Sequence, residues 1–320
     1  MLSQIAQIEI SQSWELIRKS SRIGIVSHRG PDADTVGTNL ALRLVLQPLG
    51  KIVDSICIDS LPANCRFLPQ ANNFIQEFNY NDYDLFIIVD CGASYMTAFH
   101  EKKPELLSNK VPIINIDHHE SNDNFGVYNL VQTNAASTTF ILWHLFKKWN
   151  LTITPHIATC LYAGLSFDTG SFQHDNTTPD VMRCAADLVR HNANVSLISY
   201  HLFKENSVNK LKLWGKIFNR ARVNHKQIIS SAITARDFQE SGASKKDTEG
   251  AIDYLTAVKN SKFAIMLSED MNGNIKGSLR TQGETDVAKI ASLLGGGGHK
   301  KAAGFSMPGE LKEEIEWLVS

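Results

Sequence analysis

Short apolar runs rich in β-branched residues alternate with longer amphipathic stretches through the first half of the chain. The runs at residues 22–27, 52–58, 85–90 and 112–116 predict strands, and residues 36–49 predict a helix between the first two of them. This alternation is typical of βαβ units. Residues 86–89 and 113–116 are almost continuously apolar, which favours strands inside a parallel sheet with helices on both faces.

The alternation of strands and helices changes twice after residue 137. Residues 138–149, 155–167 and 179–191 predict helices, and the mixed stretch 197–222 predicts a helical link. Beyond it, strands are expected at 228–234, 263–267, 275–280 and 303–306, with helices at 249–258 and 286–294. The sequence therefore predicts an α/β protein with a parallel-sheet domain at 1–200, a helical connector at 201–222, and a smaller α/β domain with a mixed sheet at 223–320.

Composition excludes several classes of protein. A length of 320 residues suits two domains, and 32 basic against 33 acidic residues give a formal net charge of -1. This balance argues against a coat for long duplexes or a membrane-surface protein, so an anionic partner must meet a local site. The five cysteines are scattered and form no CxxC pair, which disfavours a disulfide framework or a structural zinc site. With no signal-like N-terminus and no apolar run of membrane-spanning length, we expect a cytoplasmic protein.

Acidic residues and histidines gather where the predicted strands end. His28, Asp32 and Asp34 follow the first strand, Asp90 ends the third, and Asp117-His118-His119 follows the fourth. Asp168 comes directly after an apolar helix. Each group alone would suit a turn or a helix cap. Together they would meet at the carboxyl edge of one parallel sheet, where ligands bind in open α/β folds.

This clustering predicts a site for two divalent metal ions that clamp a phosphoryl group and lower the pKa of a shared water. The carboxylates of Asp32, Asp34, Asp90 and Asp168 carry four negative charges. Two divalent ions neutralise them, whereas without metal they would repel one another. Carboxylate and imidazole ligands favour manganese or magnesium over thiolate-binding metals.

A run of four glycines, residues 295–298, precedes His299 in the second half. By itself such a run would suit a helix stop and a flexible turn. It can also expose backbone N–H groups as an anion-binding nest. Arg280 on a neighbouring predicted strand strengthens the phosphate-binding interpretation, because its guanidinium can contact a phosphate with two parallel hydrogen bonds.

These motifs together resemble the DHH phosphoesterases, a family named for the triplet found here at 117–119. Four motifs occur in order: HRGPDAD at 28–34, VDCG at 89–92, DHH at 117–119 and GLSFDTGSF at 164–172. The second half resembles the DHH-associated substrate domain through SLR at 278–280 and GGGGHKKAAGF at 295–305. Within the family, NAAST at 134–138 and FQHDNTTP at 172–179 are most similar to the bacterial type that degrades nanoRNA and dephosphorylates phosphoadenosine phosphate.

The resemblance implies a role for each matching residue. One metal ion would be held by His28, Asp32 and Asp90, and the second by Asp34, Asp90, His118 and Asp168, with Asp90 bridging. His119 would face the substrate phosphate and help to protonate the leaving oxygen, so that His119, Asp90 and Asp168 form the expected catalytic group. Asp117 would orient a histidine from behind. Substrate binding would fall to Ser278, Arg280, Gly296, Gly297, Gly298 and His299.

The expected activity is hydrolysis of oligoribonucleotides of two to five nucleotides to mononucleotides, and of 3′-phosphoadenosine 5′-phosphate to AMP. A cyclic or linear dinucleotide phosphodiesterase of the same fold is the first alternative, and a nucleotide-sensing module without catalysis is the second. The expected partners are short RNA or small nucleotides, not long duplexes or membranes. A homodimer stays open, because periodicity alone identifies no interface.

Overall fold

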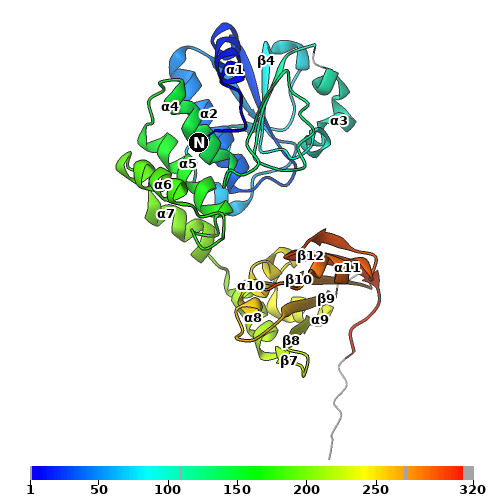
Figure 1. The fold of residues 1–320 in the computed structure, drawn as a ribbon. Coiled ribbons are helices and arrows are strands. Elements are labelled where there is room, and N and C mark those ends of the chain that lie inside the picture. The colour runs from blue at the N-terminus through cyan, green and yellow to red at the C-terminus, as the bar shows by residue number, and fades with distance from the viewer. Residues whose placement is uncertain (1, 109, 270–272, 313–320) are drawn as a thin grey trace, which may run out of the picture. The chain divides into compact units, whose positions relative to one another are not determined.

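The computed structural model describes residues 2–108, 110–269 and 273–312. The chain forms two compact units, Met1–Glu205 and Asn206–Ser320 (Figure 1). The helix α8 (Val208–Asn219) falls within the range expected to be a separate connector, 201–222. Its Leu213 and Ile217 instead lie in the core of the second unit, because α8 is amphipathic and buries this side against the sheet.

A six-stranded parallel sheet in the order β3-β2-β1-β4-β5-β6 forms the centre of the first unit. The strands β1 (Arg22–Ser27), β2 (Ile52–Ile56), β4 (Leu85–Val89) and β5 (Ile113–Asp117) lie where the sequence predicted them. The edge strands β3 (Phe74–Ile75) and β6 (Tyr128–Val131) were not predicted. Both are short and half-buried, so they lack the continuous apolar run of the central strands.

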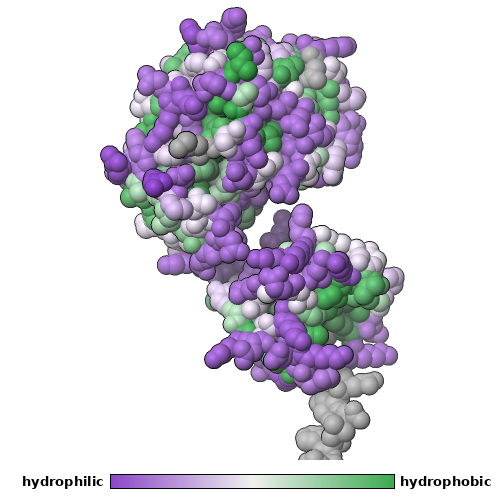
Figure 2. Space-filling model, in the orientation of Figure 1, coloured by the Kyte–Doolittle hydropathy of each residue, from purple (hydrophilic) through white to green (hydrophobic). Residues whose placement is uncertain are grey.

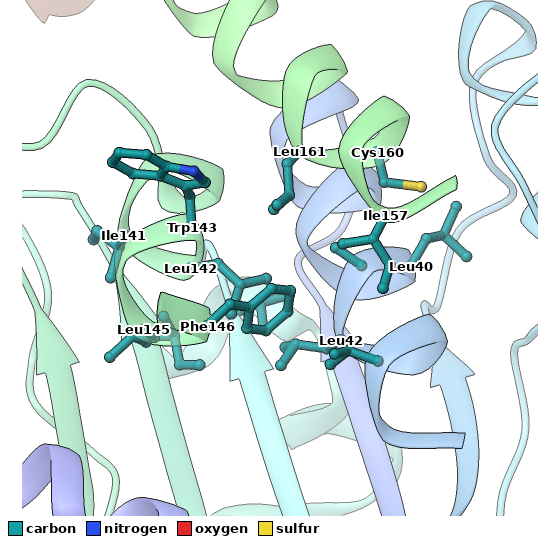
Figure 3. Packing of buried hydrophobic residues seen from close by; sticks show 14 of the residues in the cluster. Leu40, Leu42, Ile141, Leu142, Trp143, Leu145, Phe146, Ile157, Cys160 and Leu161 are labelled. Atoms are coloured by element: carbon teal, nitrogen blue, oxygen red, sulfur yellow. The ribbon is translucent and has the colours of Figure 1, made fainter. Parts of the chain in front are cut away.

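Both faces of this sheet are buried. In β4, Ile87 belongs to one apolar cluster, whereas its neighbours Phe86 and Ile88 belong to another. One face is covered by the long helices α2 (Ala33–Leu46), α4 (Thr138–Lys148) and α5 (Pro155–Asp168), whose packed side chains Figure 3 shows. Helices were expected on both faces, and the other face is covered by only the short helix α3 (Phe99–Lys102), by 3-10 turns and by Phe78 and Tyr80 among the described residues.

The remaining helices of the first unit are α1 (Gln7–Lys19), α6 (Pro179–Arg190) and α7 (Val195–Ser199), which continues into a π-helical turn at Tyr200–Lys204. Among the described residues, no helix is long and apolar enough to span a membrane. The face of the molecule in Figure 2 is mostly hydrophilic.

The start of α2 differs from the expected position by three residues. The sequence predicted a helix from residue 36, but α2 begins at Ala33 because the Asp32 carboxylate accepts hydrogen bonds from the backbone N–H groups of Asp34 and Thr35. Two of the predicted metal ligands are therefore fixed by the first turn of a helix rather than by a loop.

The second unit contains a six-stranded mixed sheet in the order β11-β12-β10-β9-β8-β7. Its strands are β7 (Arg222–Val223), β8 (Ile228–Ile233), β9 (Phe263–Glu269), β10 (Asn274–Arg280), β11 (Gly297–His299) and β12 (Ala302–Pro308). Among the strands of the described residues in this unit, only β8 and β9 pair in parallel. Besides α8, the helices are α9 (Ala235–Ser241), α10 (Ala251–Thr256) and α11 (Val287–Ser292). The polar sequence of α9 gave no helical signal, and the structure shows that a capping box at Thr234 and Asp237 begins it.

Close packing of α2 on α5 depends on Gly37, and this gives a prediction for stability. A Cβ atom at residue 37 would lie 2.4 Å from the backbone oxygen of Cys160, so Gly37→Ala must push the two helices apart. We expect a loss of about 1–3 kcal/mol in the free energy of unfolding, measured by urea denaturation.

The matched control is Gly215→Ala in the interior of α8, where a Cβ would meet no atom within 4 Å. This change should stabilise the second unit by up to about 1 kcal/mol. Equal denaturation midpoints for the Gly37→Ala variant and the wild type would contradict the account of helix packing.

Candidate metal centre

Every residue predicted as a metal ligand lies at the carboxyl edge of the parallel sheet or at the helix ends beside it. His28 follows β1, Asp90 follows β4, and His118 follows the last residue of β5. Asp32 caps α2, Asp34 lies in its first turn, and Asp168 is the last residue of α5. Six residues from distant parts of the sequence are therefore brought to one place.

Three groups of these side chains are arranged so that a metal ion could be held. Ligand atoms lie within 4.8 Å of one another in the sets His28, Asp32 and Asp90, and Asp34, His118 and Asp168; a third set joins Asp90 and His118 to His119, which was not predicted as a ligand. The donors are carboxylate oxygens and imidazole nitrogens, a set that suits manganese or magnesium. The residues present therefore fit a pair of divalent ions.

Asp90 occupies the position between the two histidines. Its Oδ2 lies 3.7 Å from Nε2 of His28, and its Oδ1 lies 3.5 Å from Nε2 of His118. The hydroxyl groups of Thr35 and Thr138 donate to these two oxygens at 2.6 Å and 2.8 Å. Its side chain is 3% exposed. Its backbone adopts a left-handed φ of 55°, because the chain turns sharply after β4. Each oxygen of this carboxylate thus faces a different half of the site.

The Asp34 carboxylate is fixed by the N-terminus of α4. Its Oδ2 accepts from the backbone N–H of Thr138 at 2.6 Å, and its Oδ1 accepts from the N–H and hydroxyl of Thr139 at 3.0 Å and 2.6 Å. These donors and the helix dipole favour the negative charge. Gly164 of α5 leaves the space for this contact, because a Cβ there would lie 2.5 Å from Oδ1.

His119 is held from behind by a buried carboxylate. Its Nδ1 lies 2.7 Å from Oδ1 of Asp117, whose other oxygen accepts from the side-chain amide of Asn122 at 2.6 Å. Asp117 is fully buried, whereas the His119 side chain is 42% exposed. Since Nδ1 is engaged with Asp117, Nε2 is the nitrogen of His119 that can meet a substrate.

The crowding of carboxylates changes their pKa values in opposite directions. Burial and the charge of Asp90 raise the pKa of Asp34 to about 7, and burial with the neighbouring carboxylates holds the pKa of Asp168 well above its usual 3.8. Burial opposes the ionisation of Asp90, yet hydrogen bonding to His28 and the charge of His118 hold its pKa below the usual range. The pKa of His28 is raised to about 9, because the hydrogen bond and charge of Asp90 outweigh burial. Bound cations would replace these protons.

A cavity of about 380 Å³ opens over the centre. Predicted ligands and His119 line it together with Met96, Ala136 and Asn176. The side-chain amide of Asn176 donates to the backbone oxygens of Ala136 and Asp168, both at 3.2 Å, and so joins the start of α4 to the end of α5. The cavity can accept one phosphoryl group with part of its ester substituents.

Sequence reasoning did not assign Thr35, Thr138, Thr139, Asn122 or Asn176 to the site, although each bonds a predicted ligand or a residue beside one. The available signal was weak. Ser137 precedes the helix predicted from residue 138 and suits an ordinary N-cap, which it does form, and Thr138 and Thr139 only begin that helix. The sequence contained nothing to show that this helix N-terminus faces Asp34.

The predicted substrate residues lie in the second unit. Strand register places Ser278, Gly304 and Gly297 in one row across β10, β12 and β11, and Arg280, Ala302 and His299 in the next row. Directly paired residues share a face of the sheet, so Ser278, Arg280, Gly297 and His299 lie on the same face. Gly298 pairs with Ala303 and lies on the opposite face. Gly296 precedes β11 and contacts Gly304. The glycine run thus passes into an edge strand, whereas the sequence suggested a turn or a nest.

Two family models match the chain. The DHH family, N-terminal domain, matches residues 22–165, and the DHHA1 domain matches residues 224–319. The second match lies within the second unit, which extends from Asn206 to Ser320.

Curated relatives and a solved structure are similar over almost the whole chain. The chain is 29% identical to a bifunctional oligoribonuclease and PAP phosphatase NrnA of Thermus thermophilus, over 90% of this chain and 84% of that protein. It is 26% identical to a protein of the same description from Mycoplasma genitalium, over 97% and 96% of the two chains. An exopolyphosphatase-related protein from Bacteroides fragilis has the same fold, with a TM-score of 0.86 at 24% identity over 98% of this chain and 94% of that chain.

The raised pKa of Asp168 predicts the effect of Asp168→Asn. Without metal, this carboxyl group resists ionisation in the folded state, so the amide should make the metal-free protein as stable as the wild type or more stable. The advantage should be absent near pH 3 and should grow as the pH rises above 3.8, where the unfolded chain loses this proton first. Thermal unfolding in a chelator at several pH values measures it.

Added manganese should stabilise the wild type more than the Asp168→Asn variant. At a hundred times its dissociation constant it should stabilise the wild type by about 2.7 kcal/mol, and Asp168→Asn should lose most of this gain. Asp82→Asn, an exposed position in the same unit, is the control and should keep it. An undiminished gain in the Asp168→Asn variant would contradict a role for Asp168 in holding metal.

Proposed function

The chain belongs to the DHH family, and on that premise we propose that it is a divalent-metal phosphoesterase that hydrolyses very short oligoribonucleotides to mononucleotides and 3′-phosphoadenosine 5′-phosphate to AMP. The observation that carries this proposal is the meeting of four carboxylates and two histidines in one site, beside a small cavity that all of them except Asp34 line. The relatives described as oligoribonuclease and PAP phosphatase cover both units of the chain, which supports the choice of substrates.

We propose that His28, Asp32 and Asp90 hold one manganese ion and that Asp34, Asp90, His118 and Asp168 hold the other, with magnesium as the alternative metal. Support comes from the ligand atoms within 4.8 Å in the first set and in Asp34, His118 and Asp168. It also comes from Asp90, whose two oxygens face different histidines. When bound, such ions neutralise the transferring phosphoryl group and supply a nucleophile at neutral pH.

The chain's own residues have separate tasks in this proposal. Thr35, Thr138 and the N-terminus of α4 hold the carboxylates of Asp90 and Asp34 in fixed orientations. His119 contacts the substrate phosphate and holds a proton at Nε2 for the leaving oxygen, because Asp117 engages its Nδ1. In the second unit, Ser278, Arg280 and His299 bind another phosphate of the substrate with the backbone of Gly296, Gly297 and Gly298.

Short substrates and a reducing compartment agree with the remaining features. The formal net charge of -1 gives the chain no excess of positive charge for binding the many phosphates of a long RNA. The five cysteines are free and buried, which supports the expectation that the protein works in a reducing compartment such as the cytoplasm.

The proposal predicts the order of turnover in a panel of labelled substrates. With manganese, a diadenylate and phosphoadenosine phosphate should be consumed at least about tenfold faster than a 24-mer RNA or cyclic di-adenylate, and a chelator should stop all turnover. Asp90→Ala should lower kcat by about 10³-fold or more, because both halves of the site share this carboxylate.

Each other outcome favours a rival. Faster loss of cyclic di-adenylate would indicate a cyclic dinucleotide phosphodiesterase. Tight binding of nucleotides by the wild type, with no turnover of any substrate in manganese or magnesium, would indicate a nucleotide-sensing module. Full activity of a folded Asp90→Ala variant would contradict the proposed site.

A further inference from the structure

The face of the second sheet that carries Ser278 and Arg280 continues beyond them. Alternate residues of a strand share one face, so Lys276 lies on this face of β10, one row before Ser278. It pairs directly with Ser306 of β12. Over β9, residues on the same face are covered, because Met266, the partner of Ser278, packs in the cluster with α8 and α10. The part of the face over β10 and β12 is hollowed instead.

This hollow is a cavity of about 360 Å³, separate from the metal centre. Lys276, Ser306 and Asn274 line it from β10 and β12, and Lys245 lines it from the 3-10 turn Lys245–Thr248. Among the described residues that line it there is no aspartate or glutamate. The ammonium group of Lys276 and the hydroxyl of Ser306 are suitable partners for a phosphate.

Glycines form part of the cavity lining. A Cβ at Gly296 would lie 2.1 Å from the backbone oxygen of Gly304, and a Cβ at Gly304 would lie 3.0 Å from the backbone oxygen of Gly277. Packing therefore excludes side chains from Gly296 and tightly restricts them at Gly304. The glycines therefore add backbone to the lining, which Phe305 completes, and a ligand can approach that backbone closely.

The spacing of the rows suits successive phosphates. Two residues along a strand span about 6.8 Å, so Lys276 lies one such step from Ser278 and two from Arg280. This step is comparable with the separation of neighbouring phosphates in an extended oligonucleotide. We propose that the cavity lined by Lys276, Lys245 and Ser306 binds a further phosphate of an oligoribonucleotide whose adjacent phosphate contacts Ser278 and Arg280. This inference rests on the proposed function and specifies its substrate class.

The proposed site makes binding depend on the number of phosphates in a substrate. One phosphate must lie at the metal centre for hydrolysis, a second at Ser278 and Arg280, and a third at Lys276. Unphosphorylated ApApA carries two phosphates and cannot fill all three positions. ApApApA carries three, and cleavage at either end leaves two adjacent phosphates for the second unit. The wild type should therefore have a lower KM for ApApApA than for ApApA.

Lys276→Ala tests the inference. It should raise the KM for ApApApA about tenfold and leave the KM for ApApA unchanged. The slope of log KM against log salt concentration for ApApApA should also fall by about 0.7, because one phosphate contact is lost. Lys276→Arg keeps the charge and should restore most of the affinity. Lys276 is exposed, so these variants should fold.

The control is Lys289→Ala, at a side chain that is 85% exposed on α11, which packs on the opposite face of the sheet. It should change neither KM. Equal effects of Lys276→Ala on both substrates, or no effect on either, would overturn the inference while leaving the proposed function intact. Failure of the wild type to hydrolyse either oligonucleotide would instead contradict the proposed function.

Discussion

Mutual repulsion among Asp32, Asp34, Asp90 and Asp168 is the physical constraint that the groups around the metal centre must offset. Four carboxylates within one small site can stay ionised only if donors and cations offset their charges. The protein supplies part of the compensation through backbone N–H groups at the starts of α2 and α4, threonine hydroxyls and the imidazoles of His28 and His118. The raised pKa values of Asp34 and Asp168 show that this compensation is incomplete. Divalent cations would neutralise the remaining negative charge.

The apolar core of the first unit holds the metal-centre residues in position. The parallel sheet buries both faces, which fixes the positions of the strand ends that carry His28, Asp90 and His118. The close approach of α2 and α5 at Gly37 joins the two helices that carry Asp34 and Asp168, and Gly164 leaves room for the Asp34 carboxylate. A substitution far from any ligand can therefore weaken the site by moving a helix. The second unit carries the proposed substrate-binding residues, and strand register arranges its polar side chains in rows about 6.8 Å apart.

The sequence predicted the central strands and the clustering of acids and histidines, because buried parallel strands are continuously apolar and their ends carry the functional groups. It did not predict β3 and β6, which are short and half-buried, or the early start of α2, which depends on a side-chain cap. It also missed the roles of Thr138, Thr139 and Asn122, since these depend on which helix end and which loop meet Asp34 and Asp117 in three dimensions. The connector expected at 201–222 contained α8, whose apolar side packs within the second unit.

The number of manganese ions bound per chain tests the central claim most directly. Equilibrium dialysis of the metal-depleted protein, with metal counted by mass spectrometry and the pair followed by electron paramagnetic resonance, measures it. The account predicts two ions per chain, magnetically coupled because Asp90 would be a ligand common to both, and a fall in occupancy when Asp90 is replaced by alanine. One ion or none at saturating manganese, or two uncoupled ions that persist in the Asp90→Ala variant, would contradict it.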